Sequence, residues 1–173
     1  MGPIFFLTIL GITSISIIII VYLFLKRQSQ KEQVNLEVEL KKQRQEFFLP
    51  NRVEAYQRAI LFLERINPNS LVMRMQNPEM PASMFQAQLL KTIRDEYDHN
   101  VAQQLFISPL GWKLLQDAKE ETIKLINISS GKIGGSTDSI MLSSAILAST
   151  AEVGDLPTNI AVEFLKKELQ SLF

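Results

Sequence analysis

The chain has no cysteine and only one histidine among its 173 residues. Without cysteine it cannot form disulfides, use a thiol as a nucleophile or hold zinc through thiolates. With a single histidine it cannot supply the repeated Glu-x-x-His motifs of a di-iron helical bundle. The formal net charge is zero and no broad basic face is evident, so the sequence does not predict nucleic-acid binding.

Charge is also absent from residues 1–25, and residues 4–25 form an uninterrupted apolar run. A helix over that run rises about 33 Å, close to the roughly 30 Å of a bilayer's hydrocarbon core. Nothing basic precedes the run, and it is too long for a cleaved signal peptide. The sequence therefore predicts a retained transmembrane anchor at residues 1–25, with the lipid bilayer as a partner.

The basic residues Lys26, Arg27 and Lys31 follow this run directly. Lysine and arginine stay on the cytoplasmic side of a membrane. We therefore expect a single-pass protein with its N-terminus outside and residues 26–173 in the cytoplasm.

Residues 26–49 contain neither glycine nor proline and are rich in lysine, arginine, glutamate and glutamine. Most of these residues favour helix, so the sequence predicts a charged helical stalk or linker at 26–50. Val34, Leu36, Val38 and Leu40 alternate with polar residues, which is also typical of a strand. No partner strand is signalled elsewhere, and the apolar pattern is too short to indicate a coiled coil.

Beyond Pro50, which is expected to end the stalk helix, the pattern predicts a helical domain at 51–173. Ser108-Pro109 is a typical helix start, and Gly154 is expected to close a helix. Residues 129–136 form a predicted loop that includes the glycine-rich stretch 131–135. The fold class is therefore all-α: a transmembrane helix, a stalk, and a bundle of about five helices at 52–66, 83–105, 109–128, 137–152 and 157–172.

The only histidine, His99, lies within the polar segment 95–99. Asp95, Asp98 and His99 are an alternative as ligands of a single metal ion, but a solvated polar helix face is the preferred interpretation. The glycine-rich loop lacks the residue order of a phosphate-binding loop. No nucleophile has a base signalled beside it, so we expect no catalysis and no cofactor.

Three stretches resemble an uncharacterised family of short bacterial proteins, a domain of unknown function. The similarity extends over roughly residues 1–130 and implies a single N-terminal span, a cytoplasmic helical domain and a bacterial inner-membrane location. It implies no activity and no catalytic residues. The stretches are Arg52–Arg58 with Leu61–Pro68, then Glu96–Asn100 with Gln103–Ser108 and Trp112, and finally Ala118–Glu121 with Ile123 and Leu125–Asn127.

The leading hypothesis is a membrane-tethered interaction or scaffold module, an accessory subunit or adaptor of an inner-membrane complex. Its partner would be an unidentified membrane protein or complex, or a second copy of the chain. One alternative is a homo-oligomeric scaffold assembled through residues 1–25 and the stalk, and another is a metal-dependent sensor or enzyme. The candidate partner-binding residues are Glu96, His99, Asn100, Gln103, Gln104 and Trp112, although a tryptophan is more often part of a core.

Overall fold

The computed structural model describes residues 2–134 and 138–171, and at residues 3–10, 12–15, 18 and 34 it describes the backbone without the side chains. Within these residues every regular element is helical and no strand is present, which confirms the all-α class. The chain divides into two compact units, residues 1–49 and residues 50–173. Each unit is described by itself.

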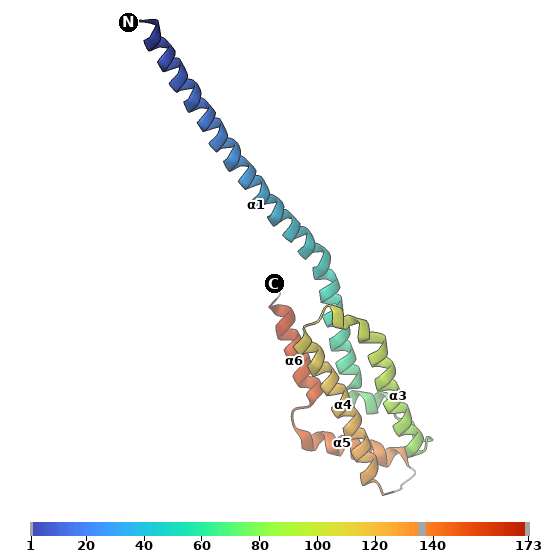
Figure 1. Ribbon diagram of the computed structural model, residues 1–173. Coiled ribbons are helices and arrows are strands. Elements are labelled where there is room, and N and C mark those ends of the chain that lie inside the picture. Colours follow the sequence, from blue (N-terminus) through green and yellow to red (C-terminus); the bar gives the residue numbers. More distant parts are fainter. Residues whose placement is uncertain (1, 135–137, 172–173) are drawn as a thin grey trace. The chain divides into compact units, whose positions relative to one another are not determined.

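Six α-helices and one 3₁₀ helix make up the described chain (Figure 1). They are α1 (Pro3–Ile66), α2 (Pro68–Met75), α3 (Ala82–Asn100), the 3₁₀ helix η1 (Val101–Leu105), α4 (Pro109–Lys132), α5 (Ser139–Val153) and α6 (Pro157–Gln170).

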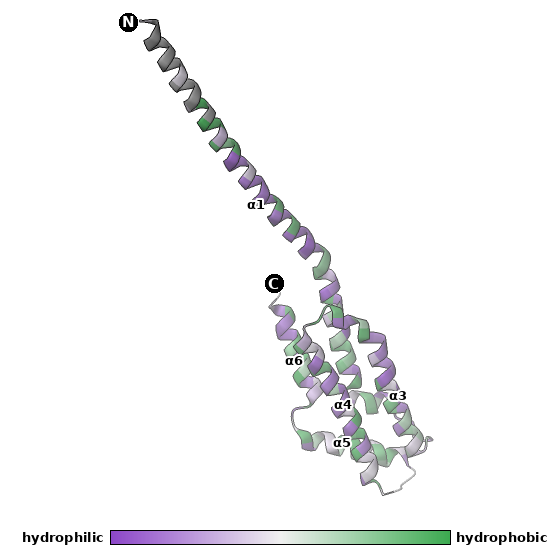
Figure 2. Cartoon of the chain, viewed as in Figure 1, coloured by the Kyte–Doolittle hydropathy of each residue, from purple (hydrophilic) through white to green (hydrophobic). Residues whose placement is uncertain are grey.

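The predicted transmembrane anchor is not supported. Across the part of the chain that the structure describes, no helix has both the length and the apolar character that a membrane crossing requires. α1 continues from the apolar residues 19–25 into the charged residues Lys26 and Arg27, and Figure 2 shows hydrophilic colours along the helix beyond this apolar part. The predicted span and the inner-membrane localisation inferred from it are therefore wrong. Most side chains of 3–18 lie outside the described residues.

Pro50 lies inside α1 rather than at a helix end, which corrects the predicted break between residues 49 and 52. Proline in a helix interior costs about 3 kcal/mol because it lacks an N–H and crowds the preceding turn. The flanking residues offset that cost. Those before Pro50 are strong helix formers, and Tyr56 and Phe62 after it are buried in the core, so packing supports the helix there.

The remaining helix starts and stops follow their local chemistry. Ser108 Oγ accepts a hydrogen bond from the N–H of Gly111 at 3.0 Å, which confirms the predicted start of α4. Gly154 follows α5 with a φ of 75°, a left-handed conformation that favours glycine and confirms the predicted stop. The loop predicted at 129–136 begins later than expected, because α4 extends to Lys132; residues 135–137 lie outside the described chain.

The helices of the second unit enclose one hydrophobic core, to which all six α-helices contribute, α6 through Leu165. Apolar and polar residues alternate around these helices, as Figure 2 shows, and the apolar positions face inward. The largest buried residues are Tyr56, Phe62, Leu63 and Ile66 of α1; Leu71 of α2; Phe85, Leu89 and Ile93 of α3; Leu115 and Ile126 of α4; and Leu142 and Ile146 of α5.

Gly111 allows α4 and α6 to approach closely. A Cβ atom added at Gly111 would lie 3.0 Å from Glu168 Oε2 and 3.0 Å from Leu165 Cδ2. Both contacts are tighter than ordinary packing allows. A larger residue at this position would therefore require the side chains of Glu168 and Leu165 to move by a few tenths of an ångström.

Tyr56 brings an ionisable hydroxyl into the same core. Burial raises the pKa of the Tyr56 hydroxyl above its ordinary value, Arg52 acts to lower this pKa, and the carboxylate of Glu168 raises it. Burial has the largest effect, because it disfavours the charged phenolate. Tyr56 is therefore neutral in the folded chain at physiological pH.

Candidate functional site

One hollow in the second unit is a cleft of about 750 Å³ between the C-terminal part of α1 and the C-terminal part of α3. One wall comes from residues 54–65 and the other from residues 92–100. Because each wall is a helix, its side chains that lie three, four and seven residues apart share the cleft face. The lining residues are Glu54, Gln57, Arg58, Leu61, Phe62, Arg65, Thr92, Asp95, Glu96, His99 and Asn100.

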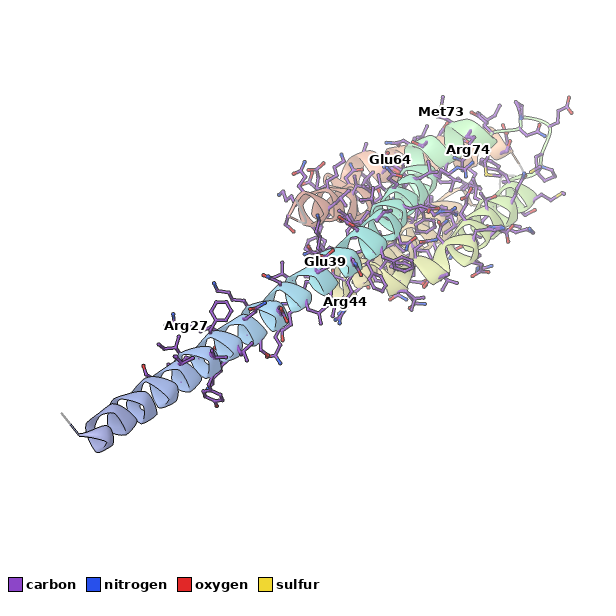
Figure 3. The ribbon with its side chains drawn as sticks, turned by 90° about the horizontal axis from the view of Figure 1, so that it is seen from above. Arg27, Glu39, Arg44, Glu64, Met73 and Arg74 are labelled. Atoms are coloured by element: carbon purple, nitrogen blue, oxygen red, sulfur yellow. The ribbon has the colours of Figure 1, made fainter. Side chains whose placement is uncertain are left out.

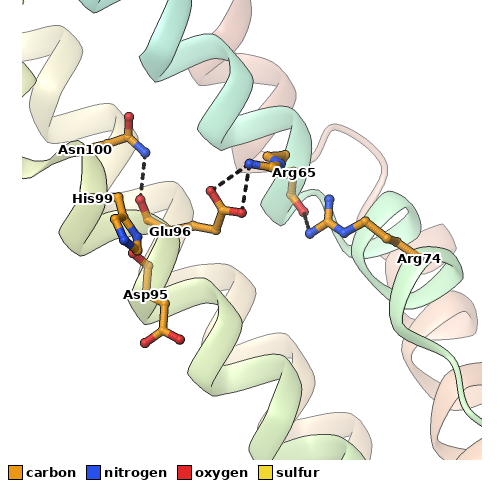
Figure 4. A network of polar contacts seen from close by, with 6 residues as sticks. All are labelled: Arg65, Arg74, Asp95, Glu96, His99 and Asn100. Atoms are coloured by element: carbon orange, nitrogen blue, oxygen red, sulfur yellow. Dashed lines mark hydrogen bonds and ion pairs between the residues drawn. The ribbon is translucent and has the colours of Figure 1, made fainter.

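An ion pair joins the two walls of the cleft (Figure 4). Arg65 Nη1 lies 3.1 Å from Glu96 Oε1 and 3.3 Å from Oε2. Arg74 of α2 donates a hydrogen bond to the backbone oxygen of Arg65 at 3.2 Å, and Asn100 Nδ2 donates one to the backbone oxygen of Glu96 at 2.7 Å. The backbone of both residues of the ion pair is thus hydrogen-bonded by a neighbouring side chain.

The charges along each wall are also paired within their own helix. Arg58 Nη2 lies 2.8 Å from Glu54 Oε1 on α1, and Lys91 Nζ lies 2.5 Å from Asp95 Oδ2 on α3. Such exposed pairs add little to stability. Their effect is to fix the direction of charged side chains around the cleft.

His99 is exposed and lies on the α3 wall. Its Nδ1 atom is 2.6 Å from the backbone oxygen of Asp95. A carbonyl oxygen can only accept, so in the neutral ring Nδ1 carries the proton and Nε2 is left as an acceptor. The histidine therefore presents a hydrogen-bond acceptor from an orientation fixed by its own helix.

Exposed apolar surface lies between these polar groups. The side chain of Leu61 is 55% exposed, while its neighbour Phe62 is buried and forms the floor of the cleft. The ring of Tyr97 packs against Phe62 at a centroid distance of 6.0 Å with the ring planes inclined by 60°, and the ring of Trp112 lies 5.8 Å from that of Tyr97. The cleft is therefore backed by a rigid aromatic row that runs from α1 through α3 to α4.

The structure brings together three of the six predicted partner-binding residues, since Glu96, His99 and Asn100 all line the cleft. Gln103 and Gln104 lie in η1 and are not among the lining residues. Trp112 is only 7% exposed and belongs to the core behind the cleft.

The cations predicted to flank a membrane, Lys26, Arg27 and Lys31, are exposed side chains of α1 in the first unit. Arg27 and Lys31 line a shallow hollow there together with Gln30 and Asn35. Figure 3 labels Arg27 on this stretch of the helix.

Sequence reasoning missed the α1 wall of the cleft. Its signal was present, because Glu54, Arg58, Leu61 and Arg65 are spaced by four, three and four residues and so share one helix face. In the sequence alone that face resembles an ordinary solvated surface, because nothing in it indicates that α3 lies beside it.

The alternative metal site is not assembled in the described chain. No three histidine, aspartate or glutamate side chains there are placed to hold a metal ion together. Asp95 instead pairs with Lys91.

Near the glycine-rich stretch, Lys132 Nζ lies 3.5 Å from Glu152 Oε2 and donates a hydrogen bond to Ser149 Oγ at 3.1 Å.

Comparison with known proteins places the chain in a family. The model of a family of unknown function, DUF7935, matches residues 3–172, and the chain belongs to this family. This confirms the expected membership of an uncharacterised family. No curated protein matches the chain, and no solved structure matches it either.

Proposed function

We propose that the helical unit of residues 50–173 is a non-catalytic protein-interaction module, and that the cleft between α1 and α3 is its binding surface. The observation that carries this proposal is the position of Leu61. A large apolar side chain that is 55% exposed lies between rows of oriented charges. An apolar anchor point surrounded by a polar rim is the arrangement typical of protein interfaces.

The shape of the cleft favours a helical segment as the bound element. Its two walls are helices that present parallel rows of side chains, and a groove of this kind accepts an amphipathic helix by its apolar face. Leu61 supplies the apolar contact, and the buried Phe62 supports it from below. Arg58 and Arg65 on one wall and Asp95 and Glu96 on the other would set the direction of the partner through its charges.

The oriented His99 ring adds specificity to this surface. Because Nε2 is an acceptor in the neutral ring, a donor on the partner, such as an amide or a hydroxyl, satisfies it. The proposal does not depend on any group outside the described cleft.

Photocrosslinking in the full chain tests this function. A photoreactive amino acid at Leu61 should capture a defined partner, and the adduct should fall at least about fivefold when His99→Ala is added, since one lost contact at the centre of an interface costs about 1 kcal/mol or more. The matched control places the same group at Met84 of α3, which is 60% exposed and outside the cleft.

Equal capture from Leu61 and Met84 would contradict the proposal. So would capture at Leu61 that is unaffected by His99→Ala, because the adduct would then reflect exposure alone. Both variants alter exposed positions, so the fold should be retained and circular dichroism provides the check.

A further inference from the structure

The first unit exposes large apolar side chains that no second element of that unit covers. The residues described from Pro3 to Leu49 belong to a single helix, α1. On it Leu36 is 60% exposed, Leu40 41% and Phe47 69%. Most helical stability in proteins comes from packing of an apolar face against another element. These side chains therefore form a surface suited to a packing partner.

The three residues lie along one line of the helix. At 3.6 residues per turn they fall within a sector about 40° wide, and Gln43 adjoins that sector. Their spacing of four and seven residues corresponds to the core positions of a coiled coil, in the order d for Leu36, a for Leu40, d for Gln43 and a for Phe47. We call residues 36, 40, 43 and 47 the stalk seam.

Two charges of opposite sign flank the stalk seam. Glu39 lies on one side at a g position and Arg44 on the other at an e position, and Figure 3 labels both. Among the described side chains, neither Glu39 nor Arg44 forms an ion pair or hydrogen bond within the chain. Both groups are therefore available to a partner on either side of the seam.

These charges select a second copy of the chain in parallel orientation. In a parallel pair a g residue meets the e residue five positions later in the other helix, so Glu39 of each copy meets Arg44 of the other. In an antiparallel pair g positions face g positions. Glu32, Glu39 and Glu46 occupy every g position of this stretch, so that arrangement would bring glutamates together.

The same rule limits the length of the paired stretch. Toward the N-terminus, Glu32 would meet Glu37 of the other copy, and the core position there is Gln33. Like charges and a polar core residue end the favourable pairing near Leu36. Near the other end the helix reaches Pro50, which cannot donate a backbone hydrogen bond.

We propose that two copies of the chain associate in parallel through the stalk seam, with reciprocal Glu39–Arg44 pairs between them. The stalk seam spans 12 residues, which is less than two heptads and too short for a stable coiled coil, so the pairing is weak and depends on protein concentration. This inference uses residues other than those of the cleft and does not rest on the proposed function.

Single-cysteine crosslinking of the full chain tests the seam, and the absence of native cysteine leaves each variant with one thiol. Gln43→Cys places that thiol in the seam, where a parallel pair brings the two copies within reach of a disulfide. Gln45→Cys is the matched control, because it changes the same residue type on the opposite face of the helix. We expect oxidation to give roughly tenfold more covalent homodimer from Gln43→Cys.

Charge reversal provides a second measurement on the same background. Arg44→Glu in the Gln43→Cys chain should reduce the homodimer severalfold, and adding Glu39→Arg should restore it, because the pair is then re-formed with its signs exchanged. The same two charge changes in the Gln45→Cys chain show how much nearby charge alone alters the reactivity of a thiol.

Equal homodimer from Gln43→Cys and Gln45→Cys would overturn the proposal, as would failure to form homodimer from either. Crosslinking of Gln43→Cys to a different polypeptide in place of itself would also overturn it. Protection of this thiol by added phospholipid vesicles without homodimer would assign the seam to a lipid surface and would likewise contradict self-association.

Discussion

The same apolar residue types are largely buried in the second unit of this chain and exposed in the described part of the first. In residues 50–171 the leucines, isoleucines and phenylalanines that recur at helical spacing are largely buried against other helices. In residues 36–48 the large apolar side chains on α1 stay exposed. Hydrophobicity alone therefore does not decide burial in this molecule. What decides it is whether a second element is available to receive the apolar face, and the bundle supplies one while the first unit does not.

The largest expected effect on the free energy of unfolding comes from comparing a buried leucine of the second unit with an exposed leucine of the first. Leu89→Ala removes a fully buried side chain from the bundle core and should lower the free energy of unfolding by about 2–5 kcal/mol. Leu36→Ala, on an exposed stalk position, should change it by less than about 0.5 kcal/mol. Denaturant titration followed by the fluorescence of Trp112, which lies in the bundle core, reports on the bundle in both variants. Similar losses would contradict the contrast between the units.

A second pair of substitutions sharpens the comparison within a single helix. Gly111→Ala adds a Cβ 3.0 Å from Glu168 Oε2 and from Leu165 Cδ2, and should destabilise the bundle by about 1–3 kcal/mol. Gly131→Ala lies in the same helix with no atom within 4 Å. It should stabilise by about 0.5–1 kcal/mol, because alanine favours helix. Thermal unfolding of both variants distinguishes them by opposite shifts in Tm.

The buried hydroxyl of Tyr56 predicts a dependence on alkaline pH. Its pKa is raised in the folded chain, so the unfolded chain loses this proton first. The stabilisation is fully present below about pH 10, the pKa of an unperturbed tyrosine, and is lost as pH rises through the folded value. Tyr56→Phe should change stability by about 1 kcal/mol or less at pH 7.

The difference in unfolding free energy between wild type and Tyr56→Phe isolates this effect from other groups that titrate at high pH. We expect the difference to move in favour of Tyr56→Phe from pH 9 to pH 11. A difference that is constant with pH would show that Tyr56 ionises equally in both states.

The smallest expected effect concerns the ion pair across the cleft. Arg65 and Glu96 are both partly exposed, so their coupling energy in a double-mutant cycle should be below about 1 kcal/mol. The measurement is denaturant unfolding of Arg65→Ala, Glu96→Ala and the double variant. A coupling well above this range would show that the pair serves mainly to stabilise the bundle.

The sequence predicted those parts of the fold that depend on local chemistry. The start at Ser108-Pro109 and the stop at Gly154 were visible because capping hydroxyls and left-handed glycines act within a few residues. Pro50 was misread because Tyr56 and Phe62 of the same helix pack into the core, and this tertiary packing outweighs a local penalty. The predicted span is contradicted by the described helices, none of which is long and apolar enough to cross a membrane.

The candidate site was predicted only on one of its walls. Glu96, His99 and Asn100 stood out because they are clustered in sequence. Arg58, Leu61 and Arg65 form the facing wall, but they lie some 30 residues away in sequence. Only the packing of α1 beside α3 creates the cleft, and no local pattern encodes that contact.

Hydrogen exchange of the full chain at several protein concentrations tests the contrast between the units most directly. We predict that amides of α3 and α4 in the bundle are protected to the same degree at every concentration. Amides of residues 36–47 should become more protected as concentration rises, because a second copy covers the seam. Protection of 36–47 that is independent of concentration, or bundle amides that exchange as fast as those of the stalk, would contradict this account.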